Sequence, residues 1–188
     1  MSLIRTQNGF LTNLNSIVER HPSGAHTIHF ANPASDTFRT TFLRIINTSP
    51  VPGNGTISGV DDDGHAAPGG NVEFTLPAGA AKQMTSKDLE TGNSDKGLSG
   101  NLGDGSGRWR LSVTADVTLK LMSLIRTPDE FLTNLSGTAP RTPGGTDIYV
   151  FNPASNFKQQ SSLRLQNNSA NDGTVTIVAT DDSGSLGG

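Results

Sequence analysis

A fifteen-residue segment occurs twice in the chain, and this duplication constrains the fold more than any other feature. Residues 1–15 read MSLIRTQNGFLTNLN and residues 122–136 read MSLIRTPDEFLTNLS, so 11 of the 15 positions are identical. Three further pairs follow at nearly the same spacing: Asn32-Pro33 and Asn152-Pro153, Leu43-Arg44 and Leu163-Arg164, Asp61-Asp62 and Asp181-Asp182. A repeat of this kind decides what counts as a domain, and it predicts about one and a half copies of a unit of about 120 residues.

The composition suits many short strands joined by tight turns. Hydrophobic residues make up only 32% of the chain, but 22 glycines and many Asn, Asp, Ser and Thr residues accompany them. Each of these residue types has a mechanical reason to occupy a turn. Because apolar residues also alternate regularly with polar ones, we expect a folded β-protein rather than a disordered chain.

Period-two alternation identifies the strands. Trp109, Leu111 and Val113 fall on one face of a strand, which predicts that they are core residues. The predicted strands are His26–Phe30, Thr41–Ile46, Gly55–Val60, Val72–Leu76, Trp109–Val113, Val117–Leu121, Met122–Arg126 and Phe131–Leu135, then Asp147–Phe151, Ser162–Gln166 and Thr174–Ala179 in the second copy. Strands at this spacing indicate an all-β fold, an antiparallel β-sandwich of immunoglobulin-like or jelly-roll-like type.

The segments between the predicted strands also allow structural predictions. The residues Thr114–Asp116 suit a hairpin between two predicted strands. Residues 78–90 are the only stretch expected to contain a helical turn, at Ser86–Glu90, and residues 92–107 are expected to be surface loops.

The repeat predicts three parts of the chain: orphan C-terminal strands of a preceding repeat at residues 1–15, a complete sandwich at 24–136 and a partial second repeat at 146–188. Alternatively, residues 1–15 are the first strands of the chain. Since Met1 aligns with the interior Met122, we expect Met1 to be a cut point in a longer array. Half-units could also complete one another within one chain, or between copies in dimers or fibres, because unpaired strand edges favour pairing.

The main candidate site consists of two aspartate-rich loops. Asp61, Asp62 and Asp63 precede Gly64, and Asp181 and Asp182 precede Ser183-Gly184. Calcium needs several hard oxygen ligands in a flexible loop, so these residues are candidate Ca²⁺ ligands. The alternative is a turn at the end of a strand, with solvated carboxylates, because adjacent strand residues point to opposite faces.

Other chemistry has weaker support. His26 and His29 lie three residues apart, which on a strand sends them to opposite faces, and His21 and His65 complete a set that the second copy lacks. We therefore expect no catalytic histidine. Trp109 is a candidate sugar-stacking platform, but its phase with Leu111 and Val113 favours a core position.

Charge and composition exclude further classes of function. A net charge of −3 without a Lys/Arg cluster argues against nucleic-acid binding, and the absence of cysteine excludes disulfides and thiol catalysis. No apolar run is long enough for membrane insertion, and residues 1–14 lack the pattern of a signal peptide. An export signal is therefore not expected within this chain.

The order of these motifs resembles tandem β-sandwich repeat modules of large bacterial secreted and surface proteins, such as adhesin-like modules and accessory modules of exoenzymes. The resemblance implies a structural or accessory module, often calcium-associated, outside the cell or on its surface. We therefore expect a non-catalytic extracellular structural or adhesive module, rigidified by Ca²⁺ or assembled by strand complementation with neighbouring repeats or other copies. The alternative is a glycan-binding accessory module of a secreted enzyme.

Overall fold

The computed structural model describes residues 3–5, 7, 9, 11–13, 18–19, 25–135, 148, 151–152, 155–156, 161, 163–167 and 169–185. Two compact units are present, residues 1–141 and residues 142–188. In unit 1 the elements are β1 (Leu3–Arg5), β2 (Leu11–Asn13), β3 (Val18–Glu19), β4 (His26–Ala31), β5 (Thr40–Asn47), β6 (Gly53–Val60), β7 (Val72–Leu76), β8 (Ala81–Thr85), α1 (Ser86–Thr91), η1 (Ser94–Lys96), β9 (Leu98–Gly100), β10 (Trp109–Ala115), β11 (Leu119–Arg126) and β12 (Leu132–Asn134).

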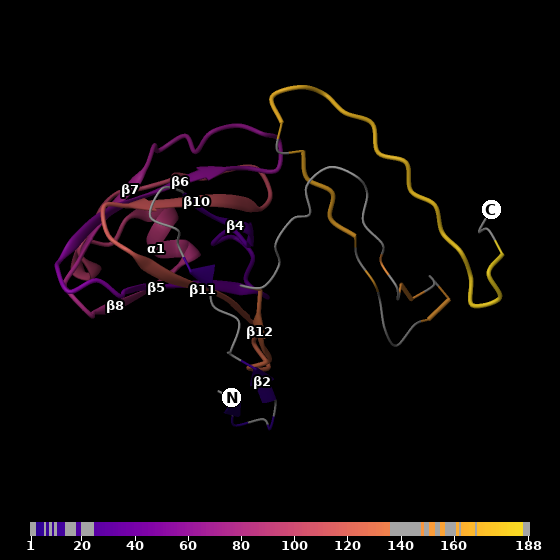
Figure 1. The fold of residues 1–188 in the computed structure, drawn as a ribbon, viewed down its shortest axis with the longest axis horizontal. Helices are drawn as coiled ribbons and strands as arrows, with labels where there is room; N and C mark the ends of the chain where they lie inside the picture. The colour runs from indigo at the N-terminus through magenta and orange to yellow at the C-terminus, as the bar shows by residue number, and fades with distance from the viewer. Residues whose placement is uncertain are drawn as a thin grey trace. The chain divides into compact units, whose positions relative to one another are not determined.

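Unit 1 is an all-β sandwich, as the alternation predicts. One sheet has the strand order β4-β10-β6-β7-β9, and the other has the order β12-β11-β5-β8, with β3 also pairing with β11. All of these pairs are antiparallel. Figure 1 shows β4, β6, β7 and β10 in one layer and β5, β8 and β11 in the other.

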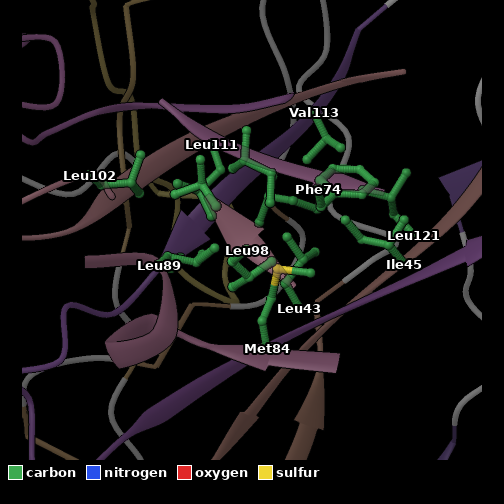
Figure 2. Close-up of a cluster of buried hydrophobic side chains, with 14 of the residues drawn as sticks. Leu43, Ile45, Phe74, Met84, Leu89, Leu98, Leu102, Leu111, Val113 and Leu121 are labelled. Atoms are coloured by element: carbon green, nitrogen blue, oxygen red, sulfur yellow. The ribbon is translucent and has the colours of Figure 1, made fainter. Parts of the chain in front are cut away.

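The core lies between the two layers and consists of the inward-facing residue of each alternating pair. Strand β5 buries Leu43 and Ile45 and leaves their neighbours partly exposed, and β10 buries Trp109, Leu111 and Val113. Figure 2 shows the side chains of Leu43 and Met84 pointing toward Leu111 and Phe74 of the opposite layer. Burial of such side chains contributes about 1.5–3 kcal/mol each, so this interior is the main source of stability.

Three expectations about unit 1 are wrong in detail. The residues after β10 do not form a hairpin: β10 and β11 belong to different sheets, so the chain crosses between layers there. The predicted strands Val117–Leu121 and Met122–Arg126 are not separate, because Leu119–Arg126 forms the single strand β11. The stretch 92–107 is not only surface loop, because it contains β9 and buries Leu98 and Leu102. A strand of three residues between glycines is too short to show alternation.

The helical turn expected at Ser86–Glu90 is confirmed as α1. Thr85 is its N-cap, and the side chains and backbone N–H groups of Thr85 and Asp88 form a capping box. This arrangement satisfies backbone donors that a helix start otherwise leaves unpaired. The helix directs Leu89 into the core.

Three strands of unit 1 whose sequences recur in unit 2 take all of their partners from other parts of the chain. Strand β4 pairs with β10, β6 pairs with β10 and β7, and β5 pairs with β8 and β11. The strands β4, β5 and β6 therefore never pair with one another, even in the complete sandwich. Their partners all come from later in the sequence.

Unit 2 follows this rule. The described residues of the predicted strands Ser162–Gln166 and Thr174–Ala179 are not in β-ladders. Of the predicted strand Asp147–Phe151, residues 147, 149 and 150 lie outside the described residues, and Ile148 and Phe151 are not in a ladder either. These strand predictions are wrong for the described residues because a strand requires a partner to satisfy its backbone groups.

Candidate functional site: the aspartate loops and the buried carboxylates

The loop after β6 uses Asp61 as a hydrogen-bond acceptor for the backbone. Asp61 Oδ1 accepts from the N–H groups of Asp63 at 3.0 Å and His65 at 2.8 Å. Asp61 Oδ2 accepts from Ser106 N–H at 3.1 Å, and the side chain is only 7% exposed. Burial raises the pKa of Asp61, but the N–H groups of Ser106, His65 and Asp63 outweigh it, so the pKa lies below its usual value.

Asp62 ties the same loop to a distant part of the chain. Its Oδ2 accepts from Arg108 N–H at 2.8 Å, and its own N–H donates to the Ser106 carbonyl oxygen at 3.0 Å. A Cβ on Gly107 would lie 2.5 Å from Asp62 Oδ2, and Gly107 has φ +69°, so this close approach requires glycine. The two carboxylates thus join the β6–β7 connection to the segment before β10.

Unit 2 contains the counterparts of the short-range hydrogen bonds that Asp61 accepts. Asp181 Oδ1 accepts from the N–H groups of Ser183 and Ser185, each at 2.9 Å. The hydroxyl of Ser183 also donates to it at 2.6 Å, and this bond with those backbone donors holds the pKa of Asp181 below its usual value. The loop therefore forms from its own residues and is independent of a β10 partner.

These bonds agree with the turn interpretation of the aspartates, and Asp63 and Asp182 lie exposed beside them. Among the described residues, no group of three or more His, Asp or Glu side chains is placed to hold a metal ion. Calcium binding by Asp61, Asp62, Asp63, Asp181 and Asp182 stays a prediction, which a calcium titration of the melting temperature would test.

The structure also shows where the candidate tryptophan and the histidines lie. Trp109 is 2% exposed, so its ring has no free face for a sugar, and the core interpretation is confirmed. His26 is buried, His29 is half-buried and His65 is exposed, with His65 Nδ1 at 3.9 Å from Asp61 Oδ2. His21 lies outside the described residues.

A buried carboxylate beside Trp109 was not expected from the sequence. Glu90 is 6% exposed, and its Oε1 accepts from Trp109 Nε1 at 2.7 Å. Both of its carboxylate oxygens also accept from Ala34 N–H at 3.1 Å. The bond to Trp109 joins α1 to β10, and the bond to Ala34 joins α1 to the β4–β5 connection, so Glu90 fixes the packing of three segments. Its only sequence signal was its position at the end of the predicted helical turn.

Asp88 forms the second buried polar cluster. It accepts from Thr85 N–H at 2.7 Å, from Asn93 Nδ2 at 2.6 Å and from Lys96 Nζ. Burial raises the pKa of Asp88, but the Lys96 ammonium and these donors dominate and lower the pKa to about 2. The cluster connects α1 to η1.

We expect Asp88 to make the stability of unit 1 depend on acid. Because its folded pKa of about 2 lies below the ordinary 3.8, its stabilisation is complete above about pH 4 and is lost as the pH falls through about 2. The contribution should be about 1–2 kcal/mol, since Lys96 is partly exposed. Urea unfolding at several pH values should show this loss in the natural chain and a weaker one in Asp88→Asn. Equal pH dependence in both proteins would contradict it.

Repeated hydrogen bonds extend beyond the aspartate loops. Asn47 Nδ2 donates to the Val51 carbonyl at 2.8 Å, and Asn167 Nδ2 donates to the Asn171 carbonyl at 2.7 Å. Thr41 Oγ1 accepts from Asn32 N–H at 2.8 Å, and its counterpart Ser161 Oγ accepts from Asn152 N–H at 2.9 Å. The asparagines shared by both copies thus shape the same turns in both.

The duplicated segment also has the same pairing in both places. In β1–β2, Leu3 pairs with Asn13 and Arg5 with Leu11; in β11–β12, Leu124 pairs with Asn134 and Arg126 with Leu132. Each residue lies 121 positions from its counterpart. The strands β2 and β12 contact each other, so two copies of one hairpin lie together in unit 1.

In the described part of the chain, no helix is both long enough and apolar enough to cross a membrane. No family model matches the chain, and neither the curated proteins nor the solved structures contain a match to it.

Proposed function

We propose that this chain is a non-catalytic structural module of a repetitive extracellular or cell-surface protein, in which β-sandwiches in series set reach and stiffness for adhesion. The observation that carries the proposal is the recurrence of one hydrogen-bond plan. The hairpin register recurs at a spacing of 121 residues, and the Asn32, Asn47 and Asp61 motifs recur at 120. Units that repeat their turns in this way can stack into arrays.

The hydrogen bonds of four polar side chains support a structural role. Asp61, Asp62 and Glu90 accept from backbone N–H groups, and Asn47 donates to the carbonyl oxygens of Val51, Leu76 and Pro77. The bonds of Asp62, of Glu90 and of Asn47 to Leu76 and Pro77 join segments far apart in the chain, and the other two close local turns. Hydrogen bonds to charged groups contribute about 1.5–3 kcal/mol, so these bonds stabilise the sandwich.

Contact between β2 and β12 suggests how successive units meet. Each hairpin corresponds to the end of one repeat, and in unit 1 the two hairpins are neighbours. A hairpin that ends one unit and lies against the next would transmit force along an array. This supports a load-bearing module over an isolated binding domain.

Stretching the full chain between marker domains in an atomic force microscope tests the proposal. Unit 1 should resist and then unfold in one step that releases about 35 nm, the contour length of roughly 110 residues. The matched variant Ile57→Ala should unfold at lower force, because Ile57 is fully buried. If a chain that is folded by circular dichroism extended without a force peak, this would contradict a load-bearing role.

A further inference from the structure

Four apolar residues of unit 2 occupy positions that are core residues in unit 1. Their counterparts Ile28, Leu43, Ile45 and Ile57 are 5%, 1%, 0% and 0% exposed. In unit 2 the equivalent residues are 52%, 42%, 55% and 63% exposed: Ile148, Leu163, Leu165 and Ile177. Each of the four is therefore exposed at a position that the complete unit buries, and lacks the neighbours that bury its counterpart.

Unit 1 shows which segment pairs with these positions. Leu111 of β10 pairs with Ile28, and Val113 of β10 pairs with Ile57. Leu121 of β11 pairs with Ile45. The two consecutive strands β10 and β11 therefore pair with β4, β5 and β6, whose sequences recur in unit 2, and one of the two lies in each layer.

We propose that Ile148, Leu163, Leu165 and Ile177 form a docking surface for a two-strand polypeptide segment of the β10–β11 type, which enters by strand addition. This inference rests on the proposed repeat function. The occupant carries apolar residues at the positions of Leu111, Val113 and Leu121, which pair with Ile148, Ile177 and Leu165 in the register of unit 1. Main-chain hydrogen bonds supply affinity, and the alternating side chains supply specificity.

Two sequence differences between the copies indicate how the occupant differs from β10. Ala179 replaces Gly59, where an added Cβ would lie 3.0 Å from the Trp109 ring. Val175 replaces Gly55, where an added Cβ would lie 2.3 Å from the Phe74 ring of β7 and 2.8 Å from the Thr114 carbonyl oxygen of β10. The occupant therefore has a side chain smaller than Trp at the position of Trp109, and its strand stands slightly away from the chain at Val175.

The probe is a fluorescein-labelled peptide of residues 108–126 that carries Trp109→Leu, titrated with the full chain and followed by fluorescence anisotropy. We expect saturable binding with one peptide per chain, and slower amide hydrogen exchange at residues 163–167 and 174–179. A peptide of the same composition in scrambled order should not bind. Failure of the ordered peptide to bind would overturn the docking surface but leave the force measurement on unit 1 untouched.

Two neighbouring residues provide a matched pair of variants. Ile177 corresponds to the inward-facing Ile57, and Val178 corresponds to Ser58, which is partly exposed on the other face of β6. Ile177→Asp should weaken peptide binding about tenfold or more, whereas Val178→Asp should leave it nearly unchanged. Both variants should melt at the same temperature as the parent chain. Equal effects of the two variants on binding would overturn the register.

A competing occupant is a second copy of the chain. Analytical ultracentrifugation at two concentrations distinguishes the two cases. A chain that stays monomeric without peptide and binds one peptide supports the proposal. Oligomers that disperse with Ile177→Asp and do not take up peptide would overturn it, because the surface would then be covered by another copy.

Discussion

Trp109→Ala should lower the free energy of unfolding of unit 1 by about 3–5 kcal/mol, the range for removing a large aromatic side chain from a core. Trp109 is 2% exposed and packs between the sheets. Its removal would also leave Glu90 Oε1 without the N–H that donates to it at 2.7 Å. Denaturant unfolding followed by far-ultraviolet circular dichroism measures the change.

Trp109→Phe separates the two contributions. Phenylalanine fills most of the volume but has no N–H, so Glu90 keeps only the bond from Ala34 N–H. We expect a loss of about 1–3 kcal/mol, the cost of removing one donor from a buried carboxylate. If Trp109→Ala and Trp109→Phe were equally destabilising, the packing of the ring would matter little. If neither changed stability by more than about 1 kcal/mol, the core position of Trp109 would be refuted.

Ile57→Ala and Ile177→Ala should have very different effects although the two residues are counterparts in the repeat. Ile57 is fully buried between the sheets, so its truncation should cost about 2–5 kcal/mol. Ile177 is 63% exposed, so its truncation should change stability by about 0.5 kcal/mol or less. Denaturant midpoints and m-values of the two single variants provide the comparison.

The outcome discriminates between two states of unit 2 in solution. Similar destabilisation by both substitutions would mean that Ile177 is also buried in a formed sandwich. A large effect at Ile57 alone would mean that unit 2 contributes little to the stability of the single chain. Leu43→Ala and Leu163→Ala repeat the comparison on the other layer, where the counterparts are 1% and 42% exposed.

The sequence predicted strands well where apolar and polar residues alternate within the strand itself. Val72–Leu76 has the predicted bounds, and Trp109, Leu111 and Val113 face the core as predicted. The predicted hairpin after β10 failed because a short connection looks the same whether it joins strands of one sheet or of two. The strands of unit 2 failed for a related reason: alternation specifies which face is apolar, but only a partner makes a ladder.

Of the candidate site, only the hydrogen bonds between residues close in sequence could be predicted. The turn at Asp61 follows from an aspartate that accepts N–H groups two and four residues later, and the same spacing recurs at Asp181. The bond from Ser106 to Asp61 spans 45 residues and the bond from Trp109 to Glu90 spans 19. No sequence pattern signals contacts of this length, because they depend on how the layers stack.

The strand order β4-β10-β6 also dictates the timing of folding during synthesis. The central partner β10 begins roughly 50 residues after β6 ends, so at ribosomal speed β6 waits about 2–10 s for it, and β4 waits longer. Long-range pairing of this kind makes folding slow. The nascent sandwich must therefore pass through a stage in which its turns are formed and its aliphatic faces are open to chaperones and to neighbouring chains.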